Sequence, residues 1–236
     1  MKRITEKLYG ILTKRGNVNF YVVANGDDLT VIDTGISAAD SDRLEAGLKT
    51  QGWSLDNVQR VLITHAHADH IGGLPELQKR ANVQTYAHKY TASIIRGEQE
   101  MDFADPAELG GLSRLMRRFL RSPSEKAQVE HELEGGEILD EVLPGFQAIH
   151  TPGHTHGHLV YWWPEQRVLI GGDVMMRLPW GLRMPLRAPS VNWQQAKQSI
   201  HQLADMNVAI LCLTHGNPLV DDVDAKIKKL SARIKS

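Results

Sequence analysis

Cysteine is nearly absent from the sequence, since Cys212 is the only one among 236 residues. No disulfide can therefore form within one chain, and a zinc or iron–sulfur site built from several cysteines is excluded. Apolar runs are short as well, and none approaches the roughly 18 residues that a membrane-spanning helix requires. The sequence thus predicts no integral membrane segment.

An excess of positive charge is also lacking. Lys and Arg total 27 against 28 for Asp and Glu, which gives a formal net charge of -1. Phosphate contacts from basic side chains supply much of the affinity of nucleic-acid-binding proteins, so we expect no nucleic-acid partner. A secretory signal needs an unbroken apolar stretch of about 7–15 residues near the N-terminus. The polar residues Thr5, Glu6 and Lys7 prevent such a stretch at the start of this sequence. We therefore expect a cytoplasmic protein.

The pattern of apolar residues predicts one domain over residues 1–236. Strand-like runs and helical periodicities alternate in the order strands, helix, strands, helix, twice over, which favours sheets packed inside and helices outside. Strands are predicted at 18–24, 29–33, 58–64, 146–150, 158–163, 167–170 and 208–213. Helices are predicted at 37–52, 192–206 and 221–234.

The segment at about 89–134 interrupts this order and is predicted to be a helical insertion. Within it, apolar residues recur with the period of a helix, while arginines lie off that stripe. The apolar residues are Leu112, Leu115, Met116, Phe119 and Leu120. A surface helix with a solvated basic face is the simplest interpretation. The alternatives are a cap over a pocket and a patch for an acidic substrate group or a membrane surface.

The most informative segment is THAHADHIGG at 64–73, which follows a predicted strand and precedes a predicted helix. Side chains two residues apart in an extended segment point the same way, so His65 and His67 can converge on one ion. Asp69 and His70 follow where the chain turns into the helix, and they can face a second ion nearby. Imidazole and carboxylate ligands suit zinc, and also iron or manganese.

Three further polar residues follow predicted strands beside glycines. They are His154 in TPGHT, Asp173 in GGD and His215 in THG. Loops at strand ends commonly converge on one site, and glycine lets the backbone approach closely. Together with the first cluster, these residues indicate a single metal site.

These motifs, in this order and with Asp33-Thr34-Gly35 near the start, resemble the pattern of the metallo-β-lactamase superfamily. The resemblance implies an α+β fold, a four-layer αββα sandwich, with two divalent metal ions at one edge of the two sheets. Zinc is the expected metal, with iron or manganese as alternatives. The resemblance assigns His65, His67 and His154 to the first ion; Asp69, His70 and His215 to the second; and Asp173 to a bridge between them. It also places Asp33 in the outer shell, where it orients the ligands.

By the same resemblance the protein is a metal-dependent hydrolase whose bridging hydroxide attacks a small-molecule ester, thioester or lactone. Asp69 is expected to be catalytic, orienting the nucleophile and then passing a proton to the leaving group. Asp173 weighs against a β-lactamase-like amidohydrolase, because β-lactam-degrading members as a rule lack a bridging aspartate. The main alternative is a mononuclear iron enzyme that resembles the persulfide dioxygenases. A metal-binding module without catalytic activity is a third.

The apolar run from Met175 to Leu186 has no clean period. We interpret it as one wall of an acyl-binding pocket, with Met176 and Trp180 as substrate contacts. Plain packing or a contact in a homodimer explains the run equally well. Arg177, the first arginine after Asp173, is expected to be solvated, with contact to a substrate carboxylate as the alternative.

Overall fold

Strand β3 (Asn19–Asn25) shows how the layers arise, because its apolar side chains serve two cores. Phe20 and Val22 point into one cluster, which also contains helix residues. Tyr21 and Val23 point into a second cluster, which contains residues of another sheet. Successive side chains of a strand face opposite sides, so β3 is covered on both faces.

The first sheet has seven strands in the order β1-β2-β3-β4-β5-β6-β7. The structure is a computed structural model that describes residues 1–12, 18–120, 122–123 and 125–234. Strands β1 to β4 are antiparallel, and β4 to β7 are parallel. The remaining strands are β1 (Lys2–Arg3), β2 (Leu8–Leu12), β4 (Asp28–Ile32), β5 (Val58–Leu62), β6 (Gln84–His88) and β7 (His131–Leu133).

The second sheet has four strands in the order β13-β10-β9-β8. They are β8 (Gln147–His150), β9 (Leu159–Trp163), β10 (Val168–Gly172) and β13 (Ile210–Leu213). Strand β9, like β3, is covered on both faces. Tyr161 and Trp163 face the first sheet, while Val160 and Trp162 face helices. A separate hairpin of β11 (Met176–Leu178) and β12 (Gly181–Arg183) follows β10.

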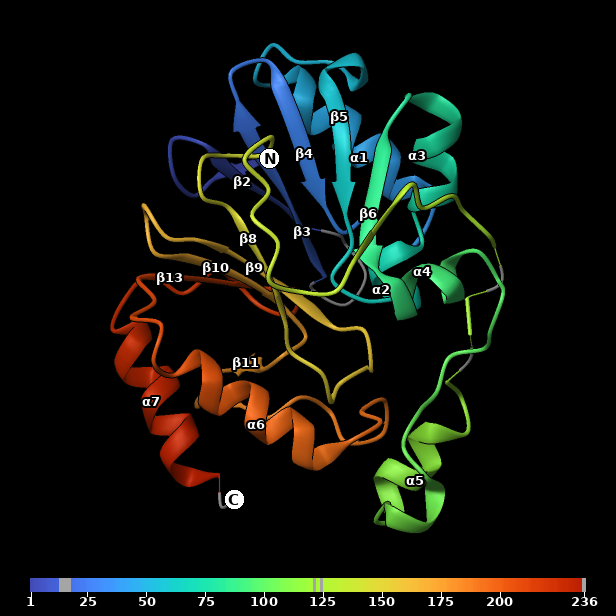
Figure 1. The fold of residues 1–236 in the computed structure, drawn as a ribbon, viewed down its shortest axis with the longest axis vertical. Helices are drawn as coiled ribbons and strands as arrows, with labels where there is room; N and C mark the ends of the chain where they lie inside the picture. The colour runs from blue at the N-terminus through green and yellow to red at the C-terminus, as the bar shows by residue number, and fades with distance from the viewer. Residues whose placement is uncertain (13–17, 121, 124, 235–236) are drawn as a thin grey trace.

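Helices cover the outer face of each sheet (Figure 1). Helices α1 (Ala39–Lys49) and α3 (Leu74–Arg80) pack on the first sheet, and α6 (Trp193–Leu203) and α7 (Val223–Arg233) pack on the second. The layers are thus helix, sheet, sheet, helix, which confirms the predicted α+β four-layer sandwich. No helix among the described residues combines the length and the apolar character needed to cross a bilayer.

The segment 89–134 contains α4 (Lys89–Ile95), the short 3-10 helix η2 (Pro106–Glu108) and α5 (Gly111–Arg117). It ends on β7, which pairs with β6 at the edge of the first sheet. Helix α5 extends away from the body of the molecule (Figure 1). Most of the predicted apolar stripe faces outward, with Leu112 80% and Phe119, just beyond the helix, 75% exposed, while Leu120 packs against a small buried cluster.

Arg114 and Arg118 are exposed, as expected of a solvated basic face, whereas Arg117 is not. Arg117 is half-buried, its Nε donates to the carbonyl oxygen of Ala104 (3.2 Å), and its guanidinium lies 4.6 Å from the ring centre of Phe103. The arginine stem and the planar guanidinium supply the packing on the inward side of the helix.

Candidate metal centre

The histidine-rich loop runs from β5 into α2 (Ala68–Ile71) at the edge where the parallel strands of the first sheet end. His67, the N-cap residue of α2, keeps an extended backbone (φ -64°, ψ 148°), whereas His70 lies within the helix. This change from extended to helical backbone turns His65 and His67 towards one point and His70 towards another. The spacing in the sequence therefore predicted the local geometry correctly.

The other three predicted residues come from the second sheet. Asp173 directly follows β10, and His215 lies in the loop after β13. His154 lies in the loop between β8 and β9, where Gly153 has a φ of +126°. A Cβ atom at Gly153 would come within 2.0 Å of the backbone nitrogen of Ala196 in α6. Only glycine allows the chain to pass so close to that helix, and this passage brings His154 to the site.

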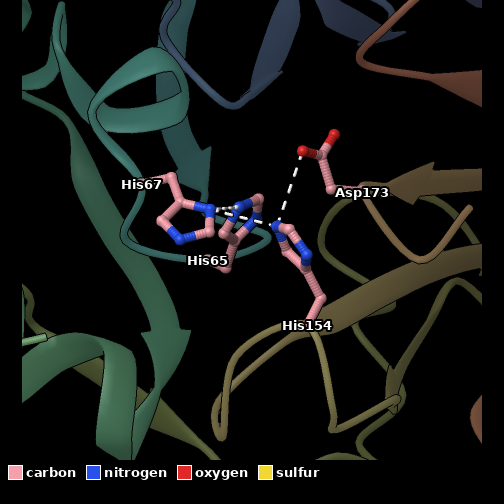
Figure 2. A group of neighbouring side chains, drawn as sticks. All are labelled: His65, His67, His154 and Asp173. Carbon is pink, nitrogen blue, oxygen red and sulfur yellow. Dashed lines mark hydrogen bonds and ion pairs between the residues drawn. The ribbon is translucent and has the colours of Figure 1, made fainter. Parts of the chain in front are cut away.

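Three imidazoles and one carboxylate form the first group (Figure 2). His67 Nδ1 lies 2.7 Å from His65 Nε2 and 3.0 Å from His154 Nε2. Asp173 Oδ2 lies 3.5 Å from His154 Nε2. Ligand atoms around a tetrahedral zinc ion, at bond lengths of about 2.0–2.1 Å, lie about 3.4 Å apart. Four donor atoms converge here from loops of both sheets, as a metal site requires.

Asp69, His70 and His215 form a second group beside the first. His215 Nε2 lies 3.5 Å from Asp69 Oδ2 and 3.4 Å from Asp173 Oδ2. His70 Nε2 lies 3.6 Å from Asp173 Oδ1. Asp173 thus reaches both groups, one oxygen towards His70 and the other towards His154 and His215. All seven predicted ligand residues are brought together.

The surroundings shift the pKa values of the two groups in opposite directions. Burial, reinforced by neighbouring imidazoles, lowers the pKa of His65 and His154 well below its usual value, and burial lowers that of His67 to about 4. Burial also acts on His70 and His215, but nearby carboxylates outweigh it and raise the pKa of both. The first group consequently offers neutral imidazoles, the form that binds metals.

Three buried atoms of site residues have no hydrogen-bond partner in the part of the chain that the structure describes, and one of them is His67 Nε2. The other two, His70 Nε2 and Asp173 Oδ1, lie 3.6 Å apart and face the centre of the cluster. A polar atom that is buried without a partner costs free energy, and a carboxylate oxygen more than a neutral group. A cation between these atoms would satisfy them.

Asp33 lies behind the cluster, as predicted. Its carboxylate accepts hydrogen bonds from the backbone nitrogen and the hydroxyl of Thr64, both at 2.8 Å. Its Oδ2 also lies 2.7 Å from Nδ1 of His70. An acceptor at Nδ1 holds the proton on that nitrogen and leaves Nε2 of His70 free to face the metal position.

Three residues that contact the site were not among the predicted site residues. His158 Nε2 accepts a hydrogen bond from the backbone nitrogen of Asp173 (3.2 Å), and burial lowers the pKa of this imidazole to about 3. Ser190 Oγ lies 3.1 Å from Nδ1 of His154, and the ring of Phe103 stacks on His67 at 5.9 Å. The spacing of four residues between His154 and His158 was a signal for the first, while no local pattern marks the other two.

The two predicted substrate contacts lie on the β11–β12 hairpin. Met176 is half-buried on β11, and Trp180 is 66% exposed between the two strands. Both follow Asp173 in the chain, and their contact with a substrate stays a prediction.

The sequence of residues 13–215 matches the family model of the metallo-beta-lactamase superfamily. The chain belongs to this superfamily. The chain is 25% identical to a probable metallo-hydrolase of Bacillus subtilis, YybB, across 86% of this chain and 82% of the relative. It is 29% identical to a hydroxyacylglutathione hydrolase of Brucella ovis, across 68% of this chain and 49% of that protein.

Solved structures of the superfamily have the same fold. A family member from Thermus thermophilus has a TM-score of 0.70 at 20% identity, covering 98% of this chain and 80% of the other. The B3 metallo-beta-lactamase BLEG-1 has a TM-score of 0.67 at 26% identity, covering 93% of this chain and 97% of the other. The protein is thus a metallo-hydrolase of the superfamily, with a cluster of histidines and aspartates that fits divalent metal.

Proposed function

We propose that this superfamily member is a dinuclear metal-dependent hydrolase of small-molecule esters, thioesters or lactones. The observation that carries the proposal is Asp173, whose two oxygens face His70 on one side and His154 and His215 on the other. One carboxylate between two ligand groups is the arrangement that holds a pair of cations. We propose zinc for both positions, with iron or manganese as alternatives.

The first ion would be held by His65, His67 and His154, and the second by Asp69, His70 and His215. When bound, such a pair lowers the pKa of a shared water towards neutrality and polarises the carbonyl oxygen of a substrate. The residues of the chain supply the rest. Asp33 orients His70, and Asp173 spans the two groups.

Asp69 is the residue that we propose to move protons. Its side chain is 34% exposed, so that it meets both the buried ligands and an entering substrate. A carboxylate at this place accepts a hydrogen bond from the attacking water and orients it. It takes a proton from that water as the water attacks and then delivers this proton to the departing oxygen or sulfur, so that hydrolysis needs no serine or cysteine nucleophile.

Thioesters are the substrates with additional support, because several relatives of the chain are named hydroxyacylglutathione hydrolases. The match covers 49% of the length of one such relative. We therefore propose thioester hydrolysis in general, with no commitment to glutathione. Cytoplasmic location, a homodimer and one domain over 1–236 stay predictions, which cell fractionation, light scattering and limited proteolysis test.

Metal analysis of protein purified without added metal is the first test. We expect two divalent ions per chain and hydrolysis of simple thioesters. Asp173→Ala should lower the occupancy of the second ion and the activity together. Asp224→Ala is the control, since it breaks only an exposed ion pair with Lys228 (2.8 Å).

Two results would contradict the proposal. Unchanged activity in Asp173→Ala would remove the bridging role of that carboxylate. One iron per chain, with oxygen consumption on a persulfide, would replace the hydrolase with the dioxygenase-like alternative.

A further inference from the structure

A cavity of about 380 Å³ lies between the β11–β12 hairpin and the loop that follows β13. Residues of both segments and of α7 line it, among them Arg177, Leu182, Gly216, Leu219 and Lys226. Its position matters because Gly216 directly follows His215, a residue of the metal centre. The cavity therefore begins one residue from the proposed metal ligands.

The same side of the metal centre is the one most open to solvent. The side chains of His215 and Asp69 are 26% and 34% exposed, whereas those of His70, His154 and Asp173 lie between 0% and 11%. A substrate that enters on this side would pass His215, and its unreactive part would then lie next to Gly216, which lines the cavity.

Arg177 packs against Gly216 in the wall of the cavity. A Cβ atom at Gly216 would lie 3.3 Å from Cβ of Arg177, so the stem of the arginine packs on the glycine. The guanidinium Nη1 donates to the carbonyl oxygens of Asn217 (2.5 Å) and Pro218 (2.9 Å). These bonds fix the cation at the cavity, in contrast to the solvated side chain expected from the sequence.

A second cation faces the same space. Lys226 is half-buried on α7, and its Nζ donates to the carbonyl oxygen of Asp221 (2.5 Å). No acidic residue is among those lining the cavity, and neither Lys226 nor Arg177 takes part in any ion pair found among the described residues. Lys228, on the same helix as Lys226, does have a carboxylate partner, since its Nζ lies 2.8 Å from Asp224 Oδ2.

Two fixed cations without a carboxylate make a place that favours an anion. The remaining lining is largely apolar, with Leu178, Pro179, Leu182 and Leu219. Ligand sites commonly combine apolar walls with a few such polar anchors.

We propose that this cavity binds the far end of the substrate, and that this end is an apolar segment bearing a carboxylate or a phosphate. The inference rests on the proposed hydrolase function and adds a substrate class to it. The ester or thioester carbonyl lies at the metal centre, the apolar segment extends past Gly216, and the anion meets Arg177 and Lys226.

Matched substrates test the proposal with the metal-loaded protein. Valeryl and glutaryl thioesters of N-acetylcysteamine have the same acyl length and differ by a terminal carboxylate, while valeryl-phosphopantetheine carries a phosphate on the thiol side. We expect one of the two anionic substrates to have a lower KM than the neutral one. Lys226→Met should raise that KM about 10-fold or more, as expected for the loss of a charge-assisted hydrogen bond. It should leave the neutral thioester unchanged.

Lys228→Met is the matched control, because it removes a positive charge from the same helix without touching the cavity. An equal effect of the two substitutions, or equal KM values for neutral and anionic substrates in the wild type, would overturn the proposed subsite. Calorimetric titration with glutarate and with inorganic phosphate reads the subsite independently of turnover. If no thioester is hydrolysed but Lys226→Met weakens anion binding, the hydrolase proposal alone is wrong.

Discussion

Asp33→Asn is the most informative single change, because it alters the hydrogen bonds at one carboxylate oxygen, those with the Thr64 hydroxyl and with Nδ1 of His70, and keeps the size of the side chain. In the native protein both carboxylate oxygens accept hydrogen bonds, from Thr64 and from Nδ1 of His70 at 2.7 Å. An asparagine can still accept from the backbone nitrogen of Thr64. Its amide nitrogen then faces Nδ1 of His70 and requires that nitrogen to accept.

The consequence is a change of tautomer. The proton of a neutral His70 must move to Nε2, the atom that faces Asp173 and the position proposed for the second ion. Loss of such an orienting partner typically lowers metal affinity or activity by about 10- to 100-fold. This factor corresponds to about 1.4–2.8 kcal/mol. The first ion, held by a different group of histidines, should bind with nearly unchanged affinity.

Competition with a chromophoric chelator measures the two affinities as separate steps of one zinc titration. Asp40→Asn is the matched control. Asp40 is also a buried carboxylate, and it accepts hydrogen bonds from the backbone nitrogens of Ile36 (2.8 Å) and Ser37 (3.2 Å). It should reduce stability without reducing metal affinity. If Asp33→Asn binds both ions as tightly as the wild type, or if Asp40→Asn weakens the second ion to the same extent, the tautomer argument is wrong.

Three further outcomes follow from the surroundings of single residues. Carboxylates raise the pKa of His70 and His215 in the metal-free protein, so protons compete with the second ion as the pH falls. The occupancy of the second ion should therefore drop at a higher pH than that of the first, as metal analysis after dialysis across a pH series measures. Parallel loss of both ions would refute this expectation. Burial raises the pKa of the Cys212 thiol, so iodoacetamide should label it only after unfolding, as mass spectrometry detects, and Cys212→Ala should keep full activity. Gly153→Ala should lower the free energy of unfolding, measured by urea titration, by at least about 2 kcal/mol, because the new Cβ collides with Ala196 and the φ value is positive. A variant as stable as the wild type would contradict the packing described for this turn.

The sequence alone predicted seven of the strands and the residues that gather in the candidate metal centre. The strands that it missed are β1, β2, β6, β7, β11 and β12. The unbroken runs of β-branched and aromatic residues in β3 and β9 favour an extended backbone through near neighbours alone, so these strands can be predicted without knowing the fold. The same holds for the histidine motif, where extended and helical backbone follow each other within a few residues. His65, His67 and His70 were therefore placed correctly in relation to one another.

Only the tertiary structure decided which distant groups meet. His67 and His154 are 87 residues apart and lie 3.0 Å from each other, a contact set by the packing of two sheets. The support that His158 gives to Asp173, and the cavity between Arg177 and Lys226, join segments that no local pattern connects. For helix α5, the apolar periodicity predicted the helix, but it did not predict that the apolar face would be the exposed one. Local sequence encodes backbone conformation, whereas the partner of each surface depends on the whole chain.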